Sequence, residues 1–403
     1  MKRLFVLLMT VLLLAGCTNA SAEEAESVSD AIVQHTLLPC ENTCPLKHIP
    51  LPDPMELLLE NMTLAQKVGQ LFIAAPEQLL QGAGQVTAMS SDLKAALAQY
   101  PVGGIILFGD NIRSPEQLLT LNSALQNTGD IPMFLAVDEE GGTVARLART
   151  GSFGLPRYPS AAAVGASGDP KDALEMGHTI GSYLKAYGFN VDFAPVADVN
   201  TNPYNPVIGK RAFSSDPVIA AQMTSAFARG LREEGVAATF KHFPGHGDTA
   251  EDSHAGLAVS YKTREALESC EWLPFSEAGS ADLIMVGHIA LPNVTGNMIP
   301  ATLSRQIVTE ILKEQLGFSG LVVTDSMQMG AITADYPAGE AAVLALQAGC
   351  DLILMPADLT AAFNAVLAAV EDETLSEAWL DEAVRRILEF KVQYGILIIE
   401  EGQ

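Results

Sequence analysis

The sequence has few positive charges. It holds 23 Lys and Arg residues against 48 Asp and Glu residues, which gives a formal net charge of −25 over 403 residues. Because a nucleic-acid-binding protein needs a basic face, this balance excludes a simple nucleic-acid binder. It also argues against binding of anionic polymers by bulk electrostatics, and a solvated acidic surface is the plainer explanation.

Cysteine is also scarce, with five residues in the whole chain. Cys270 and Cys350 lie far apart in helix-like and strand-like contexts, so we interpret both as buried apolar residues. Cys40 and Cys44 could close a small disulfide loop if the chain is exported, and two free thiols are the alternative. The sequence does not decide between these two states.

The apolar run at the start of the chain is too short for a good membrane span. Residues 1–17 begin with Lys2 and Arg3, continue as an apolar run to residue 14, and end in small residues and Cys17. This order is typical of an export signal, and its end resembles the lipobox of bacterial lipoproteins. An ordinary signal peptide with a chance Cys is the alternative. We expect an exported protein, anchored to a membrane through a lipid on Cys17 and not spanning it.

The rest of the chain divides by composition. Residues 18–54 contain Ala, Ser, Glu, Asn and Pro with little periodicity, which is typical of a tether. Residues 55–400 are enough for one large domain or two ordinary ones. The apolar runs decide between these possibilities.

Eight short apolar runs follow the tether. Most are continuously apolar, as expected for strands that are buried on both faces. They are residues 69–75, 102–108, 133–137, 189–199, 237–243, 282–287, 320–324 and 351–355.

Helix-like segments separate these runs. They include a segment that begins at Ser114-Pro115-Glu116 and residues 172–187, 216–234, 263–279, 303–316, 338–348 and 375–394. Eightfold alternation of strand and helix predicts a single (β/α)₈ TIM barrel. A doubly wound open sheet is the alternative, but the glycine fingerprint that usually follows its first strand is missing here.

A barrel places its reactive residues at the carboxyl ends of its strands. The polar residues found there are Asp138, Glu139, Glu140, Asp198, Asn200, Lys241, His242, His288 and Asp325. We therefore expect charged groups from separate strands to meet at one mouth.

Asp325 directly follows a buried apolar strand. A carboxylate in this position is costly unless it is paired or functional, and a helix N-cap is the alternative role. Its place at the expected barrel mouth favours a function.

The polar segment 241–254 follows the fifth strand. Asp252 and His254 are two residues apart, so the carboxylate can orient the imidazole, and the pair could act as a general acid/base. Lys241 and His242 could hold substrate hydroxyls, although a regular strand would point only one of them inward. Salt bridges to nearby acids are the alternative for both.

Three more residues suit sugar hydroxyls or a carboxylated ligand. Asp138 and Arg146 lie on either side of a Gly-Gly pair, and Arg211 follows the fourth strand. Each could instead be structural.

A metal site must also be considered. His242, His246, Asp248 and His254 could suggest zinc, but the chain has no HExxH motif and no H-x-H pair on the first strand. We expect no catalytic metal and no cofactor.

Four ordered segments resemble glycoside hydrolase family 3, in its β-N-acetylhexosaminidase branch. They are DEEGGTVAR at 138–146, VIGKRAF at 207–213, KHFPGHGDTAEDSH at 241–254 and GLVVTDSMQMGA at 320–331. The resemblance runs from about residue 57 to residue 394. One departure is Glu139, which stands where Gln is common.

The resemblance implies a set of roles. Asp325 would be the nucleophile, and His254, supported by Asp252, would be the acid/base. Binding of N-acetylglucosamine at the non-reducing end would fall to Asp138, Arg146, Arg211, Lys241 and His242. His246 and Asp248 would shape the loop.

The expected protein is thus an exo-acting β-N-acetylhexosaminidase with a retaining mechanism. Its substrates would be peptidoglycan fragments or chitooligosaccharides. A β-glucosidase, or an N-acetylglucosaminide phosphorylase that uses phosphate as acceptor, is the alternative enzyme. A lipid-anchored sugar-binding or scaffold protein is the non-enzymatic alternative, but a binder needs no nucleophile. The sequence leaves the aglycone and the oligomeric state open.

Overall fold

The computed structural model describes residues 53–80, 84–250, 256–277 and 282–399. All of these residues belong to one compact unit, Pro52–Gln403. Residues 1–52, which hold the expected signal segment and all but the last two residues of the tether, with Cys17, Cys40 and Cys44, lie outside the described residues, so the expected boundaries stay predictions.

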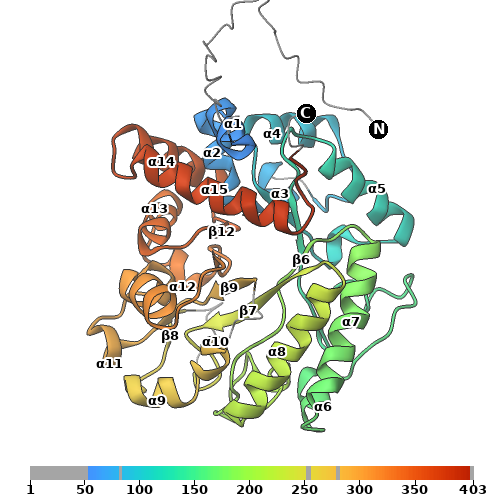
Figure 1. Ribbon diagram of the computed structural model, residues 1–403, viewed down its shortest axis with the longest axis vertical. Helices are drawn as coiled ribbons and strands as arrows, with labels where there is room; N and C mark the ends of the chain where they lie inside the picture. The colour runs from blue at the N-terminus through green and yellow to red at the C-terminus, as the bar shows by residue number, and fades with distance from the viewer. Residues whose placement is uncertain (1–52, 81–83, 251–255, 278–281, 400–403) are drawn as a thin grey trace, which may run out of the picture. The chain divides into compact units, whose positions relative to one another are not determined.

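An eight-stranded parallel sheet forms the centre of this unit, as predicted (Figure 1). Each of the eight apolar runs contains one of its strands. They are β1 Phe72–Ala74, β2 Gly104–Ile106, β3 Phe134–Val137, β6 Val191–Asp192, β7 Ala237–Phe243, β9 Leu283–Val286, β11 Leu321–Thr324 and β12 Ile353–Leu354.

The sheet is almost closed into a barrel. Neighbouring strands pair in parallel from β11 through β9, β7, β6, β3, β2 and β1 to β12. A bridge between Val323 and Leu352 then joins β11 to β12, and the N–H of Thr324 donates to the Leu352 carbonyl at 3.0 Å. The (β/α)₈ prediction is confirmed.

Helices surround the barrel and follow their strands in chain order. The described α-helices are α1 Pro54–Asn61, α2 Leu64–Gln70, α3 Pro76–Leu79, α4 Ser91–Gln99, α5 Pro115–Gln126, α6 Ala161–Gly165, α7 Pro170–Ala186, α8 Pro217–Glu233, α9 Arg264–Ser269, α10 Leu273–Ser276, α11 Pro292–Thr295, α12 Gly330–Thr333, α13 Ala338–Ala348, α14 Leu359–Glu371 and α15 Glu377–Gln393. Side-chain caps start many of them: Ser114 accepts from the N–H of Gln117 ahead of α5, with Pro115 in the first turn.

Several shorter elements lie in the loops. They are the antiparallel pair β4 Glu139–Gly141 and β5 Val144–Ala145, the parallel pair β8 Ala258–Val259 and β10 Ile289–Ala290, and the 3₁₀ helices η1 Gly109–Asn111, η2 Gly209–Arg211 and η4 Ala301–Leu303. Most of them follow the carboxyl end of a barrel strand, so they help to shape the mouth.

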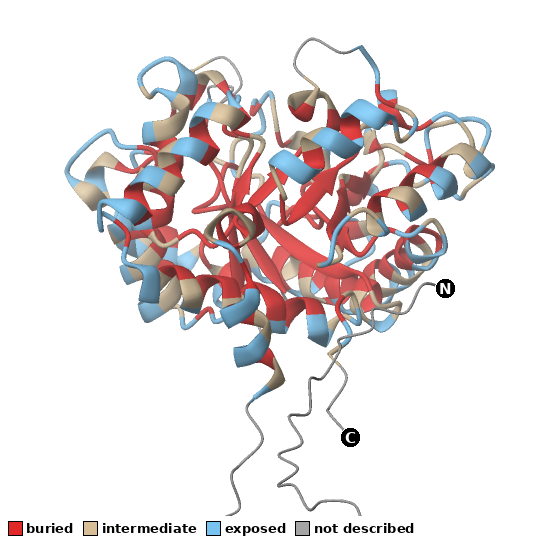
Figure 2. Cartoon of the chain, turned by 90° about the horizontal axis from the view of Figure 1, so that it is seen from above, coloured by how far each residue is buried: buried red, intermediate tan, exposed pale blue. Residues whose placement is uncertain are grey.

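The core is the layer between the strands and the inward faces of the helices. Figure 2 shows the central strands as buried and the outer faces of the helices as exposed. The last helices of the barrel, α14 and α15, pack on α2, which precedes the first strand (Figure 1). No helix of the described ranges is both long and apolar enough to cross a membrane.

Three expected elements differ in detail. The predicted helix over 263–279 is interrupted: α9 ends at Ser269, and α10 starts at Leu273, because Pro274 has no N–H with which to continue a helix. The predicted helix over 303–316 is a π-helix, η5 Gln306–Gln315, which keeps its apolar face buried. The third difference concerns the fourth strand.

The fourth strand is shorter than its apolar run. Only Val191 and Asp192 pair regularly, because Pro195 has no N–H to donate to a neighbouring strand. The chain nevertheless continues beside β7, since Val196 bridges Lys241 and the N–H of Ala197 donates to the Lys241 carbonyl at 2.6 Å. Asp198 is thereby carried alongside the end of β7.

Candidate active site

A network of charges joins the ends of β3 and β7. The Lys241 ammonium lies 2.7 Å from a carboxylate oxygen of Asp138 and 2.7 Å from one of Glu140. Arg211 holds Glu140 with two hydrogen bonds of 2.8 and 2.7 Å, and Arg146 lies 3.4 Å from Asp138. The structure therefore brings together four residues expected to bind substrate, and adds Glu140 as a link between them.

Burial and pairing set the protonation of this network. Burial by itself would raise the pKa of Glu140, but Lys241 and Arg211 outweigh it and hold that pKa far below its usual range. Burial would likewise lower the pKa of Lys241, whereas Asp138 and Glu140 raise it. Both groups are therefore charged at neutral pH, and the site presents fixed ions to a polar ligand.

Glu139 anchors the loop that carries Arg146. Its carboxylate is fully buried and accepts hydrogen bonds from the backbone N–H groups of Arg146, Leu147 and Ala148, at 2.5, 2.9 and 2.9 Å. The Tyr183 hydroxyl of α7 donates a further bond of 2.8 Å. Burial raises the pKa of Glu139 against these four donors. The sequence placed Glu139 at the end of a strand and marked it as a departure from a family pattern, but its structural role depends on α7.

Both Lys241 and His242 reach the mouth. The pairing of β7 with β9 changes register between Lys241 and Phe243, which interrupts the strict alternation of side chains. Lys241 then meets Asp138, while His242 turns to Asp198. A regular strand would point only one of these two side chains inward, and the irregularity in β7 explains why both reach the mouth.

Asp198 holds the beginning of the loop after β7. It is completely buried, and one of its carboxylate oxygens lies 2.7 Å from Nδ1 of His242. The backbone N–H groups of His242 and His246 also donate to it, at 3.3 and 2.6 Å. Burial would raise the pKa of Asp198, but His242 and His246 lower it overall.

The loop after Phe243 is fixed by further backbone contacts. Asn205 donates from its amide to the carbonyls of His246 and Thr249, at 2.8 and 3.0 Å. A Cβ at Gly247 would lie 1.8 Å from the Val199 carbonyl oxygen, so only glycine fits there. The ring of His246 is itself bonded to Thr249 at 2.7 Å, and Ser260 donates to Asp248 at 2.6 Å.

Asp325 lies at the end of β11 and is half-buried. Its carboxylate accepts a 2.7 Å hydrogen bond from the N–H of Ser326, and its own N–H donates to the Val286 carbonyl. Burial would raise the pKa of Asp325, but His242, His288 and the Ser326 N–H bring it below its ordinary value. The site thus contains an ionised carboxylate in the field of two imidazoles, and ionisation is the state a carboxylate nucleophile needs.

His288 supports the segment that follows Asp325. Its Nε2 donates to the Ser326 carbonyl at 3.0 Å, and its Nδ1 lies 2.8 Å from the Thr302 hydroxyl. His288 is completely buried, and its two contacts link the segment after Asp325 to Thr302. The sequence placed it at a strand end but gave it no role.

Asp252 and His254 lie outside the described residues. Their assignment as the acid/base pair therefore stays a prediction. Within the described part of the chain, no group of three or more His, Cys, Asp and Glu side chains is arranged to hold a metal ion. Cys270 and Cys350 are free thiols, with Cys350 buried and Cys270 only partly buried.

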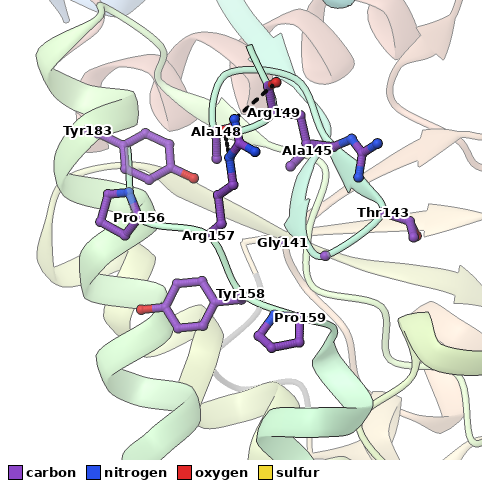
Figure 3. A pocket seen from close by; sticks show the side chains of 11 residues that line it. Gly141, Thr143, Ala145, Ala148, Arg149, Pro156, Arg157, Tyr158, Pro159 and Tyr183 are labelled. Atoms are coloured by element: carbon purple, nitrogen blue, oxygen red, sulfur yellow. Dashed lines mark hydrogen bonds between the residues drawn. The ribbon is translucent and has the colours of Figure 1, made fainter. Parts of the chain in front are cut away.

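A cavity of about 150 Å³ lies behind the β4–β5 hairpin (Figure 3). Tyr158 and Tyr183 line one side, and the hairpin lines the other. Arg157 reaches across it and donates from Nε to the Ala148 carbonyl at 2.7 Å. The cavity is lined by none of the residues that we expect to react, so we do not take it as the reaction centre.

Comparison with known proteins agrees with this geometry. Residues 63–390 match the family profile described as "Glycosyl hydrolase family 3 N terminal domain". The chain is 34% identical over 335 residues to beta-hexosaminidase A of Pseudoalteromonas piscicida, covering 76% of this chain and 56% of that protein. It is 37% identical over 275 residues to a beta-hexosaminidase of Alkalilimnicola ehrlichii, covering 67% and 78%.

A solved structure is also similar. It is a glycoside hydrolase family 3 beta-N-acetylglucosaminidase from Paenibacillus sp. str. FPU-7, with 41% identity and a TM-score of 0.77, covering 83% of this chain and 63% of that one. The chain thus spans less than two thirds of the length of the Pseudoalteromonas and Paenibacillus proteins. The family match nevertheless extends over nearly all of the described residues, and so this chain belongs to glycosyl hydrolase family 3.

Proposed function

We propose that the protein is an exo-acting β-N-acetylhexosaminidase that removes terminal N-acetylglucosamine from the non-reducing ends of glycans. The observation that carries the proposal is the ionised, half-buried carboxylate of Asp325 at the barrel mouth, beside the charge network of Lys241, Asp138 and Glu140. The hexosaminidase names of its relatives support the choice of sugar.

The proposed reaction has two steps and retains the anomeric configuration. A carboxylate oxygen of Asp325 attacks the anomeric carbon, while His254 gives a proton to the glycosidic oxygen and the aglycone leaves as an alcohol. His254 then takes a proton from water, whose oxygen attacks the same carbon and breaks the ester to Asp325. Asp252 keeps the imidazole oriented during both proton transfers.

The charged network would bind the sugar in this scheme. Asp138 can accept hydrogen bonds from sugar hydroxyls, and Arg146, Arg211, Lys241 and His242 can donate to them. Because these groups already hold one another in place, they lose little freedom when the sugar binds. In this scheme the network binds the terminal sugar, and the outer loops contact the aglycone.

One assay tests sugar, metal and nucleophile together. The protein is given p-nitrophenyl N-acetyl-β-glucosaminide or the matching β-glucoside, with and without EDTA. We expect release of nitrophenol from the N-acetylglucosaminide in both conditions, and none from an Asp325→Ala variant. Preference for the glucoside would favour the β-glucosidase alternative, loss of activity in EDTA would favour a metal enzyme, and binding without turnover would favour a sugar-binding protein.

A phosphorylase is the second candidate. A neutral imidazole at His254 repels an anionic acceptor less than the carboxylate that most retaining glycosidases use. Phosphate could then replace water in the second step and yield a sugar 1-phosphate. The absence of that product at high phosphate concentration would rule out this candidate.

We also propose that residues 1–17 direct export and that Cys17 carries the lipid anchor, with residues 18–54 as a tether to a catalytic domain over 55–400. The natural substrates would then be peptidoglycan fragments or chitooligosaccharides outside the cytoplasm. The sequence pattern of residues 1–17 supports this proposal. Wild-type protein should label with radioactive fatty acid and sediment with membranes, and a Cys17→Ser variant should do neither. Unlabelled wild-type protein would contradict the anchor.

A further inference from the structure

Asp198 is a buried carboxylate with no assigned part in the reaction. It follows the shortened fourth strand and has no exposed surface. Its two oxygens face three nitrogen atoms: Nδ1 of His242 at 2.7 Å, the backbone N–H of His242 at 3.3 Å and the backbone N–H of His246 at 2.6 Å. The carboxylate therefore holds both the side chain of an expected sugar-binding residue and the backbone around it.

The chemistry of this contact requires a proton on Nδ1 of His242. The pKa of Asp198 is below its ordinary value, so its carboxylate is ionised at neutral pH and can only accept hydrogen bonds. Nδ1 of His242 must then be the donor across the 2.7 Å contact. The other ring nitrogen, Nε2, is left for partners outside this pair.

His242 and Asp325 both contact the end of strand β9. A Cβ at Gly287 would lie 3.1 Å from the Cβ of His242, so the end of β9 packs directly against this side chain. The preceding residue, Val286, accepts a 2.9 Å hydrogen bond from the N–H of Asp325. His242 and Asp325 are thus held on either side of the same short stretch of β9.

The charged groups around His242 come from several elements. Asp198 faces it from the end of the fourth strand, and His246 follows from the next loop, with ring centroids 6.0 Å apart. Burial would raise the pKa of Asp325, but His242, His288 and Lys241 help to bring it below its ordinary value. The orientation of the His242 ring therefore matters to the electrostatics of the whole mouth.

We propose that Asp198 is a positioning residue that fixes the Nδ1–H form of His242 and so presents Nε2 to the terminal sugar beside Asp325. This inference rests on the proposed hexosaminidase function. It goes beyond that function because it adds a residue outside the expected binding set, and because it specifies the hydrogen-bonding state of His242. A merely structural Asp198 would tie the two backbone N–H groups and leave the ring free to adopt either form.

An asparagine at this position separates the two roles. In Asp198→Asn, the remaining oxygen can still accept the N–H of His246, which lies 2.6 Å from one carboxylate oxygen. The new NH₂ group would take the place of the oxygen that faces Nδ1 of His242. Because an NH₂ group only donates, it would force the proton from Nδ1 to Nε2.

Nitrogen NMR of the histidine rings tests the proposal directly. Wild-type protein labelled with ¹⁵N-histidine should show His242 with a protonated Nδ1, and a His242→Gln variant identifies its signals. Asp198→Asn should move the proton to Nε2. If wild-type His242 carries its proton only on Nε2, the proposal is wrong, and this result needs no variant at position 198 to fold and no enzymatic activity.

Kinetics on the aryl N-acetylglucosaminide then measure the consequence. We expect Asp198→Asn to lower kcat/KM by about 10- to 1,000-fold. In a His242→Gln background, the same change should cost less than about threefold, because the two residues act as one unit. Equal losses in both backgrounds would mean that Asp198 acts through the backbone alone, and the proposal would fail.

Asp351→Asn is the matched control. Asp351 is another buried carboxylate that accepts a backbone N–H, but it lies before β12 at the opposite end of the barrel. The Asp351→Asn substitution should lower thermal stability without changing kcat/KM. If the wild-type protein has no activity on this substrate, the proposed function fails, while the NMR result still decides the role of Asp198.

Discussion

Each end of the barrel contains a buried carboxylate that accepts backbone hydrogen bonds, but the two carboxylates have different side-chain partners. At the carboxyl ends of the strands, Asp198 accepts backbone N–H groups and the ring of His242. At the amino ends, Asp351 accepts the N–H of Val322 at 2.8 Å and binds Lys313 and Arg386 at 3.0 and 2.8 Å. Both carboxylates are buried and tie neighbouring segments together.

The difference lies in what remains available for a ligand. At the amino end, each acid is matched by cations: Asp351 by Lys313 and Arg386, and Asp282 by Arg232. At the mouth, Asp325 receives a backbone N–H and lies near imidazoles, so its carboxylate keeps capacity to react. The ion pairs at the amino end are therefore saturated within the protein, whereas the charges at the mouth are those that we expect to serve a ligand.

The largest expected effect comes from removing the reactive carboxylate. Asp325→Asn should lower turnover of the aryl N-acetylglucosaminide by about 10⁴-fold or more, because no other group can form the glycosyl ester. Thermal unfolding should hardly change, since the side chain accepts one hydrogen bond, from Ser326. If Asp325→Asn turned over the substrate at the wild-type rate, Asp325 would not be the nucleophile, and the mouth would no longer differ from the amino end in this respect.

The next effect concerns the proton donor. His254→Ala should slow substrates with poor leaving groups by about 10²- to 10⁴-fold, and activated aryl glycosides far less, because only the former need a proton on the departing oxygen. Rates on an aryl glycoside and on a chitooligosaccharide measure the contrast. Equal losses on both would indicate that His254 only binds substrate.

A stability change without a kinetic change is expected at the amino end. Asp351→Asn should destabilise the fold by about 2–3 kcal/mol, since Lys313 loses its carboxylate and Arg386 keeps only Glu382, although both cations remain partly exposed to water. The measurement is the midpoint of thermal unfolding together with kcat/KM. A large loss of activity in folded protein would show that the amino end also serves the reaction.

The most gradual effect is a pH dependence at the amino end. Lys391 is buried, with its ammonium 2.7 Å from the Gln70 side chain and 3.0 Å from the Gly103 carbonyl, and burial lowers its pKa to about 7. Between pH 7 and the unfolded pKa near 10.4, the unfolded chain binds the proton and the folded chain does not. Stability should therefore rise with pH in this window, by about 1 kcal/mol per unit, and the burial penalty should be complete below it.

Lys391→Met isolates this contribution. The difference in unfolding free energy between wild type and variant should shift in favour of the wild type as the pH rises from 7 to 9. A constant difference across that range would mean that Lys391 keeps its proton in the folded protein.

Much of the fold could be predicted because it depends on local patterns. Eight apolar runs, each short enough for a buried strand, predicted the eight barrel strands in order. The same patterns predicted one helix over 263–279, where Pro274 interrupts it, and a full strand over 189–199, where Pro195 ends the regular pairing. Both prolines were visible in the sequence, but their effect depends on the backbone partners that they cannot serve.

The site was predictable only in part, for a related reason. Asp325, Lys241 and Arg211 could be named as candidates because each follows a strand or belongs to an ordered motif. Glu140 and Asp198 were seen at strand ends but received no role, because their partners lie 71 and 44 residues away in the chain. Glu139 gains its role from Tyr183, which lies 44 residues further along.

The sequence by itself determined the class of fold and the family, and it predicted Asp325 as the nucleophile, because apolar periodicity and ordered motifs are properties of neighbouring residues. Only the tertiary structure decided which acid pairs with which base. The register shift in β7 lets Lys241 and His242 face different partners, and the path of the chain after Pro195 brings Asp198 to His242. Charges separated along the chain acquire defined protonation states only when folding removes water and sets the distances between them.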